Sequence, residues 1–165
     1  MAYRHVVLAV AVVSAPALAG ETSAGQGVRL ECPAGTTQKG SKPTKDLGVF
    51  CVKNGGSSDL DKVVRHGPYV DFWANGQKQS EGQFKDNLRT GRWTFYDANG
   101  VKTGETEFER NDYHGKRVEY FANGSKKLEQ AWAKGLQDGL EVIYAEDGRT
   151  VSQARFASGK LVSDR

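Results

Sequence analysis

The stretch Gly91-Arg92-Trp93-Thr94-Phe95-Tyr96-Asp97-Ala98-Asn99-Gly100 decides the fold, because its pattern recurs along the chain at steps of 24 residues. Four columns of residues keep one register without an insertion. The columns are Gly67, Gly91, Gly115 and Gly139; Gly76, Gly100, Gly124 and Gly148; Phe72, Tyr96, Tyr120 and Tyr144; and Phe84, Phe108, Trp132 and Phe156. A fixed period of this length predicts an array of structural repeats.

The second glycine column identifies each repeat as a β-hairpin. Its glycines follow Asn75, Asn99, Asn123 and Asp147, and such pairs are preferred in two-residue turns that need positive φ. Runs rich in β-branched and aromatic residues flank each pair, which is typical of strands. Asn87, Asn111, Gly135 and Gly159 occupy a second turn that returns the chain to the next repeat. Apolar residues at helical spacing are missing after the N-terminal segment, so we predict an all-β protein.

Side-chain alternation along a strand predicts which face of the sheet is buried. In first strands, one face carries Val70 and Phe72 and their equivalents in every repeat. We expect the second strands to meet this face with small residues and with the column that begins at Phe84. Large rings beside small residues can interdigitate, so we assign this face to the core.

The other face of the first strands varies between repeats, and variation is where recognition can develop. We also assign Glu81, Glu105 and Glu129 to this face, with Lys78, Lys102 and Lys126 pointing the other way. Two outcomes are open: the aromatic residues form an exposed interface, or the sheet curls and buries them. The candidate partner-binding residues on this face are Tyr69, Trp73, Trp93, Phe95 and Phe121.

The repeat resembles the MORN-repeat variant family, whose bacterial members are often described as YwqK-type antitoxin-like proteins. The resemblance rests on the Gly-x-Trp-x-x-Tyr pattern followed by Asn-Gly and covers residues 67 to about 160. It implies an elongated antiparallel β-meander of hairpins with a 24-residue period, curled as a single sheet. It also implies recognition of proteins or membrane surfaces without a cofactor. The four repeats span 67–90, 91–114, 115–138 and 139–165; the fourth departs most, with Glu141 where the second has Trp93.

Residues 20–66 are predicted to form a leader and a cap. Phe50-Cys51-Val52 resembles a degenerate first strand, and Asn54-Gly55 its turn. This unit would pair with the first true repeat and close the open edge of the array. Residues 20–31 and 36–46 are polar and rich in small residues, so we expect a mobile leader and a loop.

Cys32 and Cys51 are the only cysteines. In an oxidising compartment two cysteines most often form one disulfide, and we predict this bond. A redox pair or a pair of metal ligands is the alternative. Neither is favoured, because there is no Cys-x-x-Cys spacing and no histidine lies near either cysteine.

The N-terminus predicts export. Arg4 and His5 precede an uncharged apolar stretch from Val6 to Val13, and Ala17-Leu18-Ala19 matches a cleavage site. We therefore expect a signal peptide over residues 1–19, cleavage after Ala19, and a periplasmic or extracellular protein. A retained anchor is the alternative, but the apolar stretch is shorter than the roughly 20 residues that span a bilayer.

Composition excludes several functions and favours binding. Removing Arg4 with the signal leaves 22 basic and 20 acidic residues, a formal charge of +2, and no basic stripe typical of nucleic-acid binders is visible. We find no catalytic motif and no metal-ligand spacing. The sequence predicts a monomeric, non-enzymatic module that binds a protein, with an immunity protein against an exported toxin as the alternative. Binding to a membrane surface is weaker, since the charge is nearly neutral.

Overall fold

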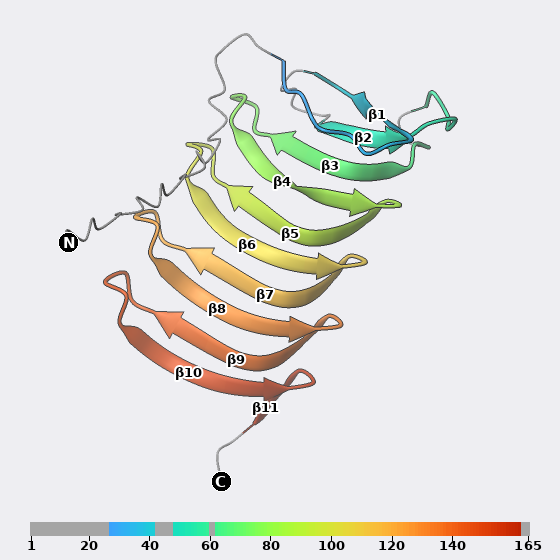
Figure 1. The fold of residues 1–165 in the computed structure, drawn as a ribbon. Helices are drawn as coiled ribbons and strands as arrows, with labels where there is room; N and C mark the ends of the chain where they lie inside the picture. Colours follow the sequence, from blue (N-terminus) through green and yellow to red (C-terminus); the bar gives the residue numbers. More distant parts are fainter. Residues whose placement is uncertain (1–26, 42–47, 60–61, 163–165) are drawn as a thin grey trace, which may run out of the picture.

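The structure is a computed structural model that describes residues 27–41, 48–59 and 62–162. Over these residues the chain forms an open antiparallel sheet in the order β1 to β11, with each strand beside its sequence neighbours. Figure 1 shows the strands stacked as a curled meander. The prediction of an all-β, single-sheet meander is confirmed. The predicted signal peptide, its cleavage site and the mobile leader up to residue 26 lie outside the described residues. No helix in the described ranges has the length and apolar character needed to cross a membrane.

The strands repeat as regularly as the sequence. A shorter pair of strands comes first, four hairpins follow it, and a short strand forms the last edge of the sheet. The strands are β1 (Thr36–Lys39), β2 (Val49–Lys53), β3 (Arg65–Phe72), β4 (Lys78–Lys85), β5 (Leu88–Tyr96), β6 (Lys102–Glu109), β7 (Asp112–Tyr120), β8 (Lys126–Ala133), β9 (Leu136–Tyr144), β10 (Thr150–Ala157) and β11 (Lys160–Val162).

The Asn-Gly pairs do not form the two-residue turns that we predicted. Trp73 N donates to Gln77 O at 2.8 Å, so residues 74–76 fill a wider loop. Only Gly76 has positive φ (83°), and the Asn75 side chain instead accepts a 3.0 Å hydrogen bond from Gln77 N. An Asn side chain that satisfies the backbone two residues later is a common turn device, and it does not require Asn itself to be left-handed.

Two-residue turns lie at the other end of the strands, between one hairpin and the next. Asp86 and Asn87 both have positive φ, at 54° and 65°, as the tight hairpin turn requires. Asn87 also binds the preceding repeat: its N donates to Arg65 O at 2.9 Å, and its Oδ1 accepts from Arg65 N at 2.7 Å. Asn111 makes the same pair of bonds with Arg89. These turns therefore join neighbouring repeats as well as neighbouring strands.

Each wide loop is followed by a β-bulge, which changes the expected direction of the lysines. Asp71 pairs with Ser80, but Phe72 pairs with Lys78, so Gln79 is an extra residue. The extra residue brings Lys78 and Glu81 to the same face, although they are three positions apart in the sequence. The prediction that the lysine and glutamate columns point apart is wrong for this reason.

A larger bulge surrounds each junction glycine. Glu81 pairs with Thr94, and Gln83 pairs with Thr90. Two residues along β4 therefore correspond to four along β5, so β5 contains two extra residues here. Gly91 lies among the extra residues with φ of 64°, and Gly67, Gly115 and Gly139 are also left-handed, at 106°, 93° and 124°. Glycine adopts this conformation without a steric cost. Since bulges bend and twist a strand, one at every repeat curls the sheet.

Strand pairing corrects the assignment of faces, because directly paired residues point the same way. Tyr69 pairs with Gly82 and Trp93 with Thr106, so Phe84 and Phe108 share their face, which we call the aromatic face. Val70 pairs with Glu81, so the glutamate column lies on the opposite side, which we call the valine face. We had placed the Phe84 column with Phe72 and the glutamates with Trp93; both placements are wrong.

Both faces contribute to the core. Val70, Phe72, Val118 and Val142 are buried on the valine face, as predicted for the first-strand residues. Trp93 and Phe108 are buried on the aromatic face, at 1% and 6% exposure. Among residues 27–41, 48–59 and 62–162 no second layer covers most of this open sheet, so large side chains on each face shield one another.

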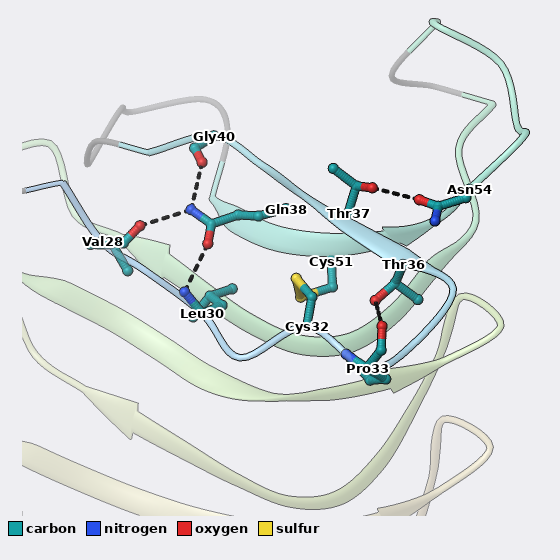
Figure 2. Close-up of a disulfide and its surroundings, with 10 residues drawn as sticks. All are labelled: Val28, Leu30, Cys32, Pro33, Thr36, Thr37, Gln38, Gly40, Cys51 and Asn54. Atoms are coloured by element: carbon teal, nitrogen blue, oxygen red, sulfur yellow. Dashed lines mark hydrogen bonds between the residues drawn. A yellow bond between two sulfur atoms is a disulfide. The ribbon is translucent and has the colours of Figure 1, made fainter.

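The N-terminal cap is more ordered than predicted. Residues 36–39 form β1 instead of a loop, and Val28 and Leu30 pack on the cluster of Val49, Val70 and Phe72. Figure 2 shows the Gln38 side chain holding this segment: it donates to Val28 O at 2.8 Å and accepts from Leu30 N at 2.8 Å.

The cap is bonded as predicted but takes a different place in the repeat. Cys32 and Cys51 form a disulfide, and Cys51 is fully buried. Phe50 pairs with Tyr69 and Val52 with Arg65, which is the same wide bulge that joins β4 to β5. The segment 50–52 therefore stands where a second strand would stand, and not where a first strand would, as we had expected.

We expect Gly82→Ala to lower the free energy of unfolding by about 1 to 3 kcal/mol, because an added methyl group would overpack the core. An ideal Cβ at Gly82 would lie 2.4 Å from the Trp93 ring. Chemical denaturation measures the effect. Gly56→Ala is the control, since its Cβ would meet only Lys53 O at 3.7 Å and should change stability by less than about 0.5 kcal/mol. Equal stabilities for the two variants would contradict the packing of Trp93 on Gly82.

We expect the double substitution Cys32→Ala and Cys51→Ala to lower the free energy of unfolding by about 3 kcal/mol, as the loop-closure model predicts for a loop of this size. The sequence separation of the two cysteines is 19 residues. Thiol labelling of the unfolded, unreduced wild-type protein is the companion measurement and should find no free thiol. Two free thiols would refute the bonded cap.

Candidate functional site

A ladder of aromatic rings runs across the aromatic face. Successive ring centroids lie 5.0 to 6.2 Å apart, and most pairs meet edge to face, the arrangement that aromatic quadrupoles favour. The ladder crosses the sheet from the cap to β8. Its rings are Phe50, Tyr69, Phe84, Trp93, Phe108, Tyr113 and Trp132.

Trp93 is the centre of the ladder and not a surface anchor. Its ring lies over Gly82, and its Nε1 donates to Gln83 O at 3.2 Å. At 1% exposure it has no area to offer a partner. Of the two outcomes left open by the sequence, burial is the one that holds for Trp93.

Beyond β6 the positions equivalent to Trp93 on the aromatic face are polar. Arg117 occupies the position of Trp93 one repeat later, and Glu141 occupies it two repeats later. Arg117 forms an ion pair with Glu119 and donates to Gln130 Oε1 at 2.9 Å. Gln130 in turn donates to Glu141 Oε2 at 2.6 Å. A hydrogen-bonded network therefore takes the place of the tryptophan in the last two hairpins, while Tyr113 and Trp132 continue the ring packing in the third.

A groove of about 540 Å³ lies where the ladder meets this network. Its floor is Gly104 and Thr106 on β6, which carry little side-chain volume. Phe95 and Glu119 flank Gly104 as its strand partners, and Trp93 and Arg117 flank Thr106. At the equivalent floor positions, Trp93 covers Gly82 in the first hairpin, whereas Leu128 and Gln130 bring larger side chains in the third. The groove thus follows from small residues on one strand.

Arg89 and Tyr113 stand at the end of the groove. The Arg89 guanidinium lies 4.9 Å from the Trp93 ring centroid and 5.5 Å from that of Phe108. Arg89 is exposed, and among the described residues no carboxylate lies within 4.0 Å of it. Tyr113 is 36% exposed and packs its ring on Phe108. The groove therefore combines apolar rings with a cation that has no ion-pair partner in the described chain.

On the valine face, lysine, glutamate and tyrosine form a repeated cluster. Lys78 Nζ lies 2.9 Å from Glu81 Oε2, and Tyr96 donates to Glu81 Oε1 at 2.5 Å. Lys102, Glu105 and Tyr120 repeat the arrangement one hairpin later. Burial acts to raise the pKa of Glu81, but hydrogen bonds from Tyr96 and Lys78 outweigh it and hold that pKa below its ordinary value. Burial, followed by the Glu81 carboxylate, raises the pKa of Tyr96.

The predicted partner-binding residues separate into three places. Tyr69 and Trp93 lie together in the ladder, with centroids 5.6 Å apart, and Phe95 lines the groove. Trp73 and Phe121 lie in the wide loops, where Trp73 Nε1 donates to Tyr96 O at 3.0 Å. Apart from Trp93, these residues are half-buried.

Sequence reasoning missed Arg89 and Tyr113 as site residues. Both lie two positions before a junction glycine, in a column that reads Arg65, Arg89, Tyr113 and Gln137. Continuing the side-chain alternation of the variable face to the residues before the junction glycine would have placed both residues on that face.

The histidines and acids of the described chain do not form a metal site. No group of three or more potential ligands gathers among the described residues. His66 Nδ1 lies 3.0 Å from Asp86 Oδ1, and His114 Nδ1 lies 3.3 Å from Glu109 Oε2. Each histidine thus contacts a carboxylate beside a tight turn.

We expect Trp93→Ala to lower the free energy of unfolding by about 3 to 5 kcal/mol, because it empties the most buried position of the ladder. Phe95→Ala should cost less, since Phe95 is only half-buried. Urea denaturation of both variants measures the difference. A larger loss for Phe95→Ala would show that the groove wall, and not the ladder, supports the sheet.

We expect Glu81→Gln to destabilise the protein at neutral pH but not in acid. A carboxyl group with a lowered folded-state pKa contributes stability above its unfolded value of 4.5, and this contribution is lost as the pH falls through the folded value. Unfolding free energies of wild type and variant between pH 7 and pH 2 should therefore converge at low pH. Lys78→Met should remove part of the same pH-dependent difference. A difference that persists unchanged in acid would exclude the ionised cluster as its source.

Comparison with known proteins agrees with the hairpin register. A family model, the MORN repeat variant, matches residues 65–86 and 89–110, which correspond to the hairpins β3–β4 and β5–β6. Among curated proteins nothing matches the chain. A solved structure, described as a Glycosylation Associate Protein (Gap123) complex from Streptococcus agalactiae, is similar at 14% identity with a TM-score of 0.39; the match covers 72% of this chain but only 20% of that one. The first two hairpins therefore match the MORN repeat variant, in the register that the structure shows.

Proposed function

We propose that this protein is a non-enzymatic binding module that holds a protein partner on its aromatic face, outside the cytoplasm. The observation that carries the proposal is the groove between the ladder and the polar network. It places the half-buried ring of Phe95 and the exposed ring of Tyr113 beside charged groups in the middle of the array. Aromatic and arginine side chains at the centre of a surface are the residue types that dominate binding energy in protein interfaces.

Binding suits the groove better than catalysis. Of the described residues that line it, none is a cysteine, serine or histidine. Arg89, Arg117 and Tyr113 can bind and orient a partner, but a nucleophile with an adjacent base, the usual sign of covalent catalysis, is not among these lining residues. The regular array also presents its side chains on a rigid sheet, which suits recognition without rearrangement.

Two features support a location outside the cytoplasm. Residues 1–19 carry the charge, apolar stretch and small-residue site of a signal peptide. The Cys32–Cys51 disulfide fits an oxidising compartment, where such bonds persist. An immunity protein would be the same module with an exported toxin as its partner, so the identity of the partner separates the two roles.

The test is affinity capture from the cell envelope with the exported protein and two matched variants. Phe95→Ala alters the groove, whereas Arg92→Ala alters the same strand on the valine face. We expect a partner that Phe95→Ala loses and Arg92→Ala keeps, with both variants melting close to wild type. A partner that only Arg92→Ala loses would move the binding surface to the valine face and overturn the proposal.

A further inference from the structure

We propose that the groove binds an extended segment of the partner protein that carries an acidic side chain next to an apolar one, with Arg89 receiving the carboxylate. The inference rests on the proposed function and adds to it the chemistry of the partner.

Positive charge exceeds negative charge in the groove. The lining contains three cations, Arg89, Arg117 and Lys127, and one carboxylate, Glu119. Arg117 and Lys127 both approach Glu119, Lys127 at 3.9 Å. Glu119 therefore already serves two of the cations, and Arg89 remains without a carboxylate among the described residues. A partner brought to this groove gains most by supplying a negative group at Arg89.

Arg89 is held in place by the ladder. Its guanidinium lies over both Trp93 and Phe108, at 4.9 and 5.5 Å from their ring centroids. The rings hold the cation from one side, and because Arg89 is exposed its N–H donors can reach a planar acceptor of a partner. A carboxylate can then accept two parallel hydrogen bonds from a side chain that has already lost much of its freedom.

Comparison with the equivalent residue of the first hairpin shows why this arginine site occurs in one described repeat. Arg65 stacks in the same way on Phe50 and Phe84, at 5.0 and 5.8 Å. Arg65 is half-buried beside the cap, whereas Arg89 is exposed. Tyr113 and Gln137 occupy the position in the later hairpins, so Arg89 alone joins a stacked guanidinium to open surface among the four described equivalents.

The floor suits an extended chain. It runs along β6 from Gly104 to Phe108, a strand length of about 13 Å, which accommodates roughly four residues of extended peptide. Phe95 and Tyr113 line the groove and can contact an apolar side chain that neighbours the acid. A lipid surface fits less well, because the groove is recessed and contains Glu119, and the mature chain is nearly neutral.

The experiment pans a phage library of random linear heptapeptides on the full exported protein. The enriched peptides are then synthesised with each acid replaced by its amide. We expect enriched peptides to contain Asp or Glu beside an apolar residue, and the amide peptides to bind wild-type protein about tenfold or more weakly. The peptide exchange needs no protein variant, so it does not depend on whether a substitution folds.

Protein variants test whether the preference for acidic peptides depends on Arg89. Arg89→Gln should weaken binding of the acidic peptides about as much as the amide exchange does. The variant protein should bind the acidic and the amide peptides with equal affinity. Arg92→Gln is the matched control, since Arg92 is an exposed arginine of the same strand on the valine face, 3.5 Å from Glu107, and it should bind as wild type does. Thermal melts of both variants report folding independently.

The other outcomes each overturn a defined statement. Peptides that need Phe95 but bind equally well as acid and amide would overturn the acidic chemistry and leave the proposed function standing. Peptides that bind regardless of Phe95→Ala and Arg89→Gln would overturn the groove as the site. Failure of any peptide to bind, together with Arg89-dependent binding to vesicles of phosphatidylcholine and phosphatidylserine, would overturn both the inference and the protein partner.

Discussion

A left-handed glycine in every hairpin is the constraint on which the rest of the structure depends. At Gly67, Gly91, Gly115 and Gly139 the chain inserts extra residues into one strand, and the positive φ at each site is a conformation that a side chain would strain. The insertion comprises two residues, so the alternation of side chains continues unbroken on either side of the bulge. Each repeat thus bends while its side chains keep to the same faces of the sheet. Repetition of that bend curls the open sheet.

The bend brings neighbouring repeats close enough for their rings to meet. Trp93 lies over Gly82 and contacts Phe84 and Phe108, so a side chain from the second hairpin fills the floor of the first. One repeat later Arg117 stands in the place of the tryptophan, and the groove lies over Gly104 and Thr106. The groove therefore combines small floor residues on β6 with the change from tryptophan to arginine, and it lies where an apolar surface meets a polar network. This juxtaposition, rather than any single residue, supports the proposed binding role.

The cap gives the array a closed beginning. β2 is buried on both sides, by the Val49 cluster on the valine face and by the Phe50 cluster on the aromatic face. The disulfide and the Gln38 side chain hold the preceding segment against it, which covers apolar surface that the first hairpin would otherwise expose. The ladder begins at Phe50 in this cap, so the same element that protects the edge also anchors the rings that position Arg89.

The sequence by itself determined the period, the hairpins, the class of fold and the bonded cap, because glycine spacing, strand propensity and cysteine pairing are local or entropic properties. Only the tertiary structure decided which residues share a face. Alternation sorts side chains within one strand, but the partner strand is set by pairing, and Val70 opposite Glu81 reversed our placement of two columns. The bulge at Gln79 likewise turned Lys78 toward Glu81, which no count along the sequence would show. Burial of Trp93 and exposure of Arg89 depend on contacts between repeats, and such contacts exist only once the sheet has curled.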